Sequence, residues 1–309
     1  MPADQQPASP TLEIMLPYYG PVGLLQAAVR SVLAQQDPQW TLTVVDDAYP
    51  DRSVAAWLAD LHDERVRYLR NEVNLGVNQN FQRCLDLVTR DLVVIIGGDD
   101  LLLPNYVGTV RDAHTARPAA AVIQPGVQVI DGAGRPARTL VDEVKRRVYA
   151  PKPAAILEMA GEDLAVSLLR GNWLYFPSLC WRVSAIGETR FRPGLDTIQD
   201  LALVIDLIMA GESLLVVPTT CFQYRRHAGS ESSLRAEHGS RFQEERRFFL
   251  DVAHRATAQS WLRAARTARL HLSSRLHALS VLPGALRRRD SAAIARLTRH
   301  VVGSARGAG

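Results

Sequence analysis

Residues 93–104 read VVIIGGDDLLLP, and this stretch decides the prediction of the fold. A run of apolar residues that ends in glycines is typical of a strand buried inside a sheet. Gly97 and Gly98 would let a ligand approach the backbone closely, while Asp99 and Asp100 would repel each other. A hard cation such as Mg²⁺ or Mn²⁺ removes that repulsion, and it commonly binds one or two carboxylates together with phosphate oxygens and water. The other interpretation of an isolated aspartate pair is a turn with a side-chain cap.

A second strand that ends in two carboxylates favours the ligand-binding interpretation. The stretch TLTVVDD, residues 41–47, ends in Asp46 and Asp47. Around the two strands, apolar strand patterns alternate with helical ones, with further strands at 12–16 and 65–69 and helices at 24–33, 54–61 and 78–88. This alternation predicts an α/β fold with a Rossmann-like, mostly parallel sheet covered by helices on both faces. Because ligands bind outside the carboxyl ends of such strands, both aspartate pairs are expected at one site.

The rest of the chain carries a looser pattern. We expect a pair of strands within 120–130, a loop from 131 to 155, helices at 162–170 and 198–210, and a strand at 213–218. From about residue 237, arginine alternates with Leu, Ala and Phe at helical intervals. This pattern predicts a helical C-terminal region.

The composition is that of a folded protein without a membrane span or disulfides. The 309 residues are 47% hydrophobic, and no apolar run reaches the roughly 20 residues that cross a bilayer. The first ten residues lack the basic and apolar regions of a signal peptide, so we expect a disordered leader and a cytoplasmic protein. Cys84, Cys180 and Cys221 show no CxxC spacing, which fits a reducing compartment and argues against a zinc site.

Positive charge is concentrated in the C-terminal region. Residues 236–309 contain 14 Arg, no Lys and 5 acidic residues, a net charge of +9, so the whole-chain value of +4 leaves −5 for residues 1–235. An arginine-rich amphipathic helix is typical of peripheral contact with the anionic inner face of a membrane. The same pattern also fits a helical cap or a contact between two copies of the chain in a homodimer. A nucleic-acid partner is not expected, because few aromatic residues lie among the arginines.

Five segments follow one another in a characteristic order, namely IMLPYYG (14–20), SVLAQQ (31–36), VVDDAYPDRS (44–53), NEVNLGVNQNFQRCL (71–85) and IIGGDDLLLP (95–104). Together they resemble glycosyltransferase family 2, the inverting enzymes of the GT-A fold, and linked motifs are far more specific than single ones. The resemblance implies a GT-A domain at 11–235, with a nucleotide-binding half at 11–110 and an acceptor half at 111–235. The leader at 1–10 and the basic helical region at 236–309 lie outside this domain.

The resemblance implies a site for a nucleotide-sugar donor, such as a UDP- or dTDP-sugar. The donor-binding residues would be Pro17, Tyr19, Asp46, Asp47, Asn74, Gly76, Asp99 and Arg225. Asp100 would be the principal ligand of Mn²⁺ or Mg²⁺, with Asp99 and His227 as further ligands.

The family also uses a carboxylate as catalytic base at the start of a helix that ends in glycine. Here IQDLALVIDLIMAG (198–211) matches, so Asp200 would take the proton of the acceptor hydroxyl, with Gln199 in place of the usual glutamate. A helix cap is the structural alternative for this aspartate. The acceptor, a saccharide or a lipid-linked saccharide, would meet Asn172, Trp173 and Ser178, although aromatic residues there equally fit a core.

Two departures from the family pattern keep a second hypothesis open. Gly98 stands where many relatives have a third acidic residue, and Gln199 replaces a glutamate. The leading hypothesis is inverting transfer of a sugar to a hydroxyl on a glycan, lipid-linked saccharide or small metabolite, as in cell wall or polysaccharide biosynthesis. The alternative is a nucleotide-binding pseudo-glycosyltransferase or scaffold. A nucleotidyltransferase is disfavoured, because no Gly-rich basic loop follows the first strand.

Overall fold

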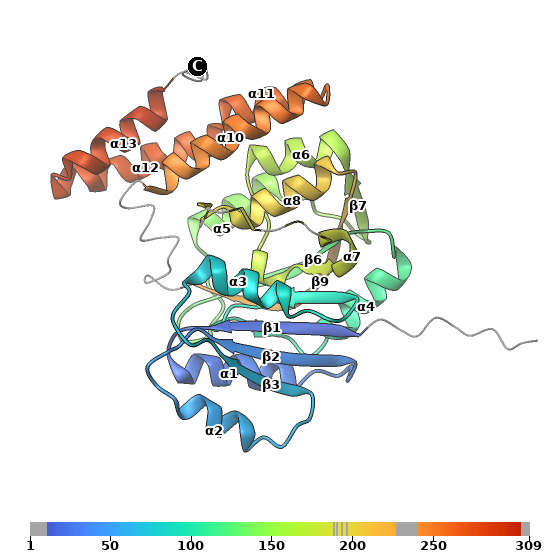
Figure 1. Ribbon diagram of the computed structural model, residues 1–309. Coiled ribbons are helices and arrows are strands. Elements are labelled where there is room, and N and C mark those ends of the chain that lie inside the picture. Colours follow the sequence, from blue (N-terminus) through green and yellow to red (C-terminus); the bar gives the residue numbers. More distant parts are fainter. Residues whose placement is uncertain are drawn as a thin grey trace, which may run out of the picture.

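The computed structural model describes residues 11–187, 189, 191–192, 194–195, 197–226 and 240–303. The expected leader and the metal-ligand candidate His227 lie outside the described residues. Within them, nine strands form one sheet in the order β3-β2-β1-β4-β8-β6-β9-β5, with β7 paired to β9 (Figure 1). The strands are β1 (Leu12–Tyr18), β2 (Trp40–Asp46), β3 (Val66–Arg70), β4 (Leu92–Ile95), β5 (Leu101–Leu102), β6 (Val122–Ile130), β7 (Leu157–Ala160), β8 (Cys180–Arg182) and β9 (Ser213–Arg225).

Six of these nine strands run in one direction, which confirms the prediction of a mostly parallel α/β sheet. β1 to β4 are parallel neighbours, β6 and β9 form a second parallel pair, and β8 joins the two groups by antiparallel pairing with β4 and β6. β5 and β7 are antiparallel to β9. The strand pair expected within 120–130 is a single strand, β6, because Pro125 and Gly126 shift its register with β9 instead of reversing the chain.

Helices cover both faces of the sheet (Figure 1). They are α1 (Val22–Leu33), α2 (Ser53–Ala59), α3 (Val77–Asp86), α4 (Tyr106–Ala116), α5 (Leu140–Val144), α6 (Gly161–Arg170), α7 (Val183–Ile186) and α8 (Gln199–Met209). Along β4, Val93 and Ile95 enter one hydrophobic cluster while Val94 and Ile96 enter the other, as the alternation of a strand requires. Helices α1, α2 and α4 share the second cluster, and α3, α6 and α8 share the first.

The segment from 131 to 155, expected as a loop, contains helical turns. α5 continues into a short π-helical turn at Lys145–Tyr149. Gly171 lies directly against this turn, since a Cβ there would fall 2.5 Å from the Tyr149 ring. The segment is therefore packed against the chain that follows α6.

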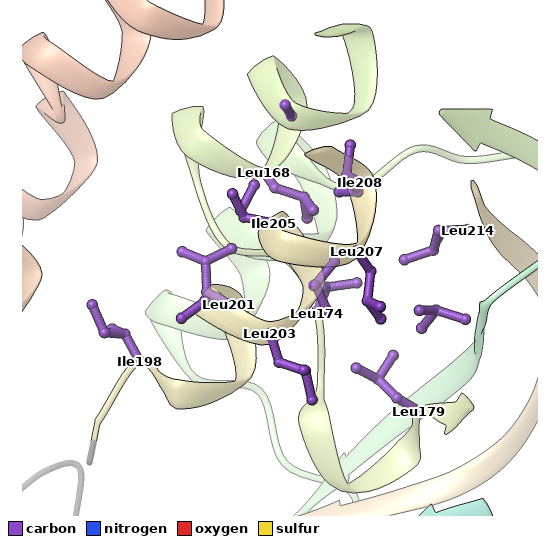
Figure 2. Packing of buried hydrophobic residues seen from close by; sticks show 14 of the residues in the cluster. Leu168, Leu174, Leu179, Ile198, Leu201, Leu203, Ile205, Leu207, Ile208 and Leu214 are labelled. Carbon is purple, nitrogen blue, oxygen red and sulfur yellow. The ribbon is translucent and has the colours of Figure 1, made fainter. Parts of the chain in front are cut away.

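The C-terminal region divides into two parts with different roles. Its helices are α10 (Ser240–Ala258), α11 (Leu262–Leu270), α12 (Leu272–Arg288) and α13 (Ser291–Val302). Phe248 and Phe249 of α10 join the same cluster as Ile205 of α8, whose surroundings Figure 2 shows. α12 and α13 build a smaller core around Phe242. The first two helices of the region thus complete the main core. No helix in the described part of the chain is long and apolar enough to cross a membrane.

Candidate active site

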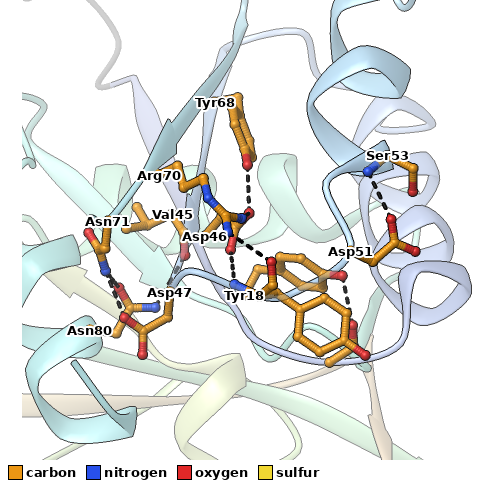
Figure 3. Close-up of polar contacts among 12 residues, drawn as sticks. Tyr18, Val45, Asp46, Asp47, Asp51, Ser53, Tyr68, Arg70, Asn71 and Asn80 are labelled. Carbon is orange, nitrogen blue, oxygen red and sulfur yellow. Dashed lines mark hydrogen bonds and ion pairs between the residues drawn. The ribbon is translucent and has the colours of Figure 1, made fainter. Parts of the chain in front are cut away.

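Asp46 is a buried anchor at the carboxyl end of β2 (Figure 3). Its Oδ1 accepts a hydrogen bond from the backbone N–H of Tyr49 at 2.8 Å. Its Oδ2 accepts from the hydroxyl of Tyr68 and from Nη1 of Arg70, each at 2.5 Å. Burial and the bond to this carboxylate raise the pKa of Tyr68, so its hydroxyl remains a donor. A buried charge is tolerated here because it is paired and hydrogen-bonded.

Asp47 organises the loop between β3 and α3. Its Oδ1 accepts hydrogen bonds from the side-chain amide of Asn71 and the backbone N–H of Leu75, both at 2.8 Å, and its Oδ2 accepts from the backbone N–H of Gly76 at 2.9 Å. Gly76 adopts a φ of +81°, which side chains other than glycine disfavour. Asn71 also donates to Asn80 at 2.9 Å. Asp47 and Gly76 therefore shape the predicted donor site, and their direct contact with a nucleotide stays a prediction.

An exposed aromatic surface lies beside these carboxylates. Tyr19 is 57% exposed, and its ring meets that of Tyr49 edge to face, with ring centroids 5.2 Å apart. Pro17 belongs to β1 and pairs in register with Val45 of β2. Asn74, also predicted to bind the donor, is exposed on the neighbouring loop. The residues predicted for the base pocket thus lie at the end of β1 and on the loop between β3 and α3, and the ring of Tyr19 is exposed enough to meet a planar ligand.

Asp99 and Asp100 follow β4 and are held by Arg225 at the end of β9. Asp100 is buried, and its Oδ1 accepts a hydrogen bond from the backbone N–H of Arg225 at 2.8 Å. The side chain of Arg225 donates to the backbone carbonyl of Asp99 at 2.7 Å. A Cβ on Gly97 would lie 2.6 Å from Oδ2 of Asp100, whereas a Cβ on Gly98 would meet no atom closer than 3.8 Å. The turn therefore needs glycine at position 97 only.

The aspartate pair fits a divalent cation. Burial and the negative charge of Asp99 raise the pKa of Asp100 well above its ordinary value, and a cation would relieve that repulsion. Oδ1 of Asp100 accepts a hydrogen bond from the backbone of Arg225, and a backbone hydrogen bond from Gly97 also acts to lower the pKa of this carboxyl group. No group of three or more His, Cys, Asp or Glu in this part of the chain could hold a metal, so the fit rests on the two adjacent carboxylates with phosphate and water as further ligands.

Arg225 and Arg226 hold loops together at the end of β9. Arg225 Nη1 donates to the carbonyls of Asp131 and Gly132 at 3.0 and 3.1 Å. Arg226 forms two parallel hydrogen bonds to Asp142, at 2.8 and 2.7 Å. Both guanidinium groups are thus engaged within the protein, and contact of Arg225 with a donor stays a prediction.

Asp200 opens α8 in the acceptor half. Asn172 Nδ2 approaches its Oδ2 at 3.5 Å, so these two predicted residues lie together. Burial raises the pKa of Asp200, while the backbone N–H of Leu201 and the positive charge of Lys145 act in the opposite direction. Ile198 occupies the N-cap position, so Asp200 does not cap the helix. A carboxylate with a raised pKa beside a neutral amide has the chemistry of a general base.

Trp173 and Ser178 are core residues in this structure. The indole N–H of Trp173 donates to Ser167 at 3.1 Å, and the residue is only 3% exposed. Ser178 is fully buried, and its hydroxyl donates to the carbonyl of Tyr175 at 2.7 Å and accepts from Gln124 at 2.9 Å. Because the hydroxyl of Ser178 is satisfied in both directions, this arrangement gives no support to its predicted contact with an acceptor.

Sequence reasoning did not predict three polar residues that lie close to one another, Lys145, Tyr175 and Asp142. Lys145 donates to the carbonyl of Leu174 at 3.2 Å and lies 4.8 Å from the ring centre of Tyr175. The Tyr175 hydroxyl in turn donates to Asp142 at 3.0 Å. Lys145 and Asp142 lie in the segment expected to be a loop, which carries no periodic pattern that would bring them to the site.

Comparisons with known proteins identify a family for the N-terminal part of the chain. A sequence model of the family described as Glycosyl transferase family 2 matches residues 13–166. An uncharacterized protein of Mycobacterium tuberculosis (strain CDC 1551 / Oshkosh), MT1568, is 35% identical over 103 residues, which are 33% of this chain and 32% of that protein. Two proteins named as candidate glycosyltransferases are each 26% identical. EpsE of Bacillus subtilis (strain 168) matches over 32% of this chain and 36% of its own, and the colanic acid biosynthesis protein WcaA of Escherichia coli (strain K12) over 31% and 35%. The matched region spans about a third of the length of these relatives.

Solved structures extend the likeness of the fold over nearly the whole chain. Residues 1–349 of S. aureus TarS in complex with UDP-GlcNAc superpose with a TM-score of 0.65 at 11% identity, covering 94% of this chain and 89% of that one. The complex of the same protein with UDP gives a TM-score of 0.65 at 13% identity over 94% and 81%. At this identity the likeness shows a shared fold.

Proposed function

Because the chain belongs to glycosyltransferase family 2, we propose that it transfers a sugar from a nucleotide-diphosphate sugar to an acceptor hydroxyl, with inversion at the anomeric carbon. One observation carries the proposal: the two aspartate pairs follow β2 and β4, which are both parallel to β1, so the pairs lie on the same edge of the sheet. The UDP-GlcNAc and UDP complexes of TarS, which shares the fold, support a UDP-sugar donor. The name of WcaA supports a role in polysaccharide biosynthesis.

In this proposal the donor lies across the ends of β1, β2 and β4. Tyr19 stacks on the base, and the loop that Asp47 holds through Gly76 lies beside the base and ribose. Asp99 and Asp100 would hold the Mn²⁺ or Mg²⁺ ion, with His227 a further candidate ligand outside the described residues. The ion would supply positive charge that stabilises the departing diphosphate.

The chemistry of transfer needs one base near the acceptor. Asp200 takes the proton of the acceptor hydroxyl while its oxygen forms a bond to the anomeric carbon. The bond from that carbon to the diphosphate oxygen breaks at the same time, and the nucleoside diphosphate leaves with the electron pair. Attack opposite to the leaving group inverts the anomeric centre. Asn172, at 3.5 Å from Asp200, orients the carboxylate.

A nucleotide-binding protein without transferase activity is the second candidate. It is favoured by Gly98, which leaves only two acidic residues at the metal turn, and by Gln199, whose buried Oε1 has no hydrogen-bond partner among the described residues. Both candidates predict nucleotide binding, and only an assay of sugar transfer distinguishes them.

Calorimetry and a transfer assay test the proposal. We expect UDP or dTDP to bind only with Mn²⁺ or Mg²⁺ present, and Asp100→Ala to abolish that binding. Asp200→Asn should keep donor affinity but lose transfer by a factor on the order of 10² to 10⁴, the contribution of a general base. Metal-independent binding would contradict the donor site. Full transfer by Asp200→Asn would place the base elsewhere, and donor binding without any transfer would favour the scaffold.

We also propose that α12 contacts an anionic membrane surface at the inner face of the membrane. Leu272, Leu276, Leu279 and Leu286 share one face of this helix and are 59%, 62%, 49% and 54% exposed. The opposite face packs through small residues such as Ala278. The surrounding region carries a net charge of +9, which favours anionic headgroups over a second copy of the same basic face.

Vesicle sedimentation tests this contact. Binding to phosphatidylglycerol vesicles should fall with added salt and with Leu276→Ser combined with Leu279→Ser, while Leu157→Ser on β7 serves as an exposed control. A homodimer is the alternative occupant of the leucine face. Light scattering that shows a dimer lost in the same double variant, without vesicle binding, would favour it.

A further inference from the structure

A cavity of about 790 Å³ lies in the acceptor half, between the β6–β9 pair and the segment around α5. Apolar walls line much of it, including Val127, Val216 and Pro218. Its volume matches that of small-molecule sites, which combine apolar walls with a few polar groups. Neither the donor site nor the leucine face of α12 includes it.

The cavity shares neighbouring residues with Asp200. Asn172 touches Asp200, and Trp173 and Tyr175 of the same short segment line the cavity. Lys145 also lines the cavity, and its charge acts on Asp200. A molecule in the cavity would therefore lie next to the carboxylate that we propose as base.

The charged groups on the cavity wall have a positive excess. Four cations line it, Arg138, Lys145, Arg146 and Lys152, together with the acids Asp142 and Glu143. Both acids are already paired by guanidinium groups. Arg226 holds Asp142 through two bonds, and Arg146 and Arg147 hold Glu143 at 2.8 and 2.6 Å.

Within the described part of the chain, Lys145 and Lys152 donate hydrogen bonds only to backbone carbonyls. Lys145 donates to the Leu174 carbonyl at 3.2 Å, and Lys152 donates to the Arg147 carbonyl at 3.3 Å. Burial lowers the pKa of Lys145 to about 8, which leaves it mostly protonated at pH 7. Asp200 and Asp142 lie close enough to act on the charge of Lys145, whereas the carbonyl partner of Lys152 does not neutralise its charge, so the exposed side of the cavity attracts an anion.

We infer that the cavity binds an acceptor saccharide that carries a carboxylate or phosphate group. This inference rests on the proposed function, since it assigns the substrate class of the same transferase site. The apolar wall contacts the carbon faces of the sugar, and Arg138 and Lys152 at the exposed rim meet the anionic group. A neutral sugar of the same size gains only the first of these contacts.

Calorimetry on the full chain tests the inference with three probes, a methyl glucuronide, a glucosyl phosphate and a neutral methyl glucoside. We expect both charged probes to bind more tightly than the glucoside, by about tenfold or more, and the difference to shrink with salt. The charged probe that binds more tightly identifies the anionic group of the acceptor, carboxylate or phosphate. Equal affinities of charged and neutral probes, or no binding of the charged ones at millimolar concentration, would overturn the inference.

Rim variants supply the second arm. Arg138→Gln with Lys152→Gln should weaken the charged probes by about tenfold and leave the glucoside unchanged. Arg135→Gln is the matched control, because Arg135 is exposed on the same segment, pairs with Asp131, and neither residue lines the cavity. Equal loss in the control would also overturn the inference. UDP titration of each variant keeps the tests separate: lost UDP binding with retained charged-probe binding contradicts the proposed function alone.

Discussion

Replacing Asp46 with asparagine should destabilise the protein far more than replacing Asp63, although each aspartate is paired with an arginine. Asp46 is fully buried, and its partner Arg70 is 24% exposed. Asp63 and its partner Arg65 are 21% and 39% exposed. Removing one partner of a buried pair costs about 3–5 kcal/mol, and we expect about 3 kcal/mol here, because water can reach part of Arg70. The exposed pair should contribute about 0–1 kcal/mol.

Asparagine at position 46 also turns one hydrogen-bond acceptor into a donor. It keeps an oxygen for the backbone of Tyr49 but faces Tyr68 and Arg70, both donors, with an amide N–H₂ group. Urea denaturation followed by circular dichroism measures the difference as a shift in midpoint at constant slope. If Asp46→Asn and Asp63→Asn differ by less than about 1 kcal/mol, the assignment of Asp46 as a buried anchor is wrong.

Three further predictions follow from the geometry. Gly97→Ala should cost about 1–3 kcal/mol and weaken metal-dependent UDP binding, because its Cβ would lie 2.6 Å from Asp100, while Gly98→Ala should behave like wild type in both assays. Lys145→Met should move the acidic limb of the pH profile of transfer to higher pH. Asp200 must be ionised to accept a proton, and the variant removes a cation that lowers its pKa. An unshifted limb would show that Lys145 does not act on the catalytic base. Truncation before α10 should give an insoluble chain, because it removes Phe248 from the main core, whereas truncation after α11 should leave a folded protein; circular dichroism of the two products decides.

The sheet could be predicted because its strands carry their own signal. Successive residues of β4 face the helices on opposite sides of the sheet, so the strand is apolar throughout. The glycines that follow end the apolar run. The carboxyl ends of such strands meet at one edge whatever the loops do. This is why the positions of Asp46, Asp47, Asp99 and Asp100 followed from local pattern alone.

The acceptor half could not be predicted in the same way. Asp142 is held by Tyr175, 33 residues away in the sequence, and by Arg226, 84 residues away. Lys145 lies on a short π-helical turn without hydrophobic periodicity. Ser178, predicted to meet the acceptor, is hydrogen-bonded to Gln124 inside the core, and its contact with an acceptor stays a prediction. Contacts between distant segments decide these cases, and sequence pattern does not report them.

The two aspartate pairs look alike in sequence but differ in what remains available to a ligand. Both oxygens of Asp46 and both of Asp47 accept protein hydrogen bonds. The donors lie on the loop after β2, on β3 and on the loop before α3. Asp100 accepts hydrogen bonds from the backbone of Arg225 and of Gly97 only, as far as the described residues show, and no side chain donates to it there. A cation needs carboxylate oxygen that the protein has not already used. We therefore expect the first pair to build the pocket and the second to bind the metal, which makes Asp100→Ala the sharper test of ligand binding and Asp46→Asn the sharper test of stability.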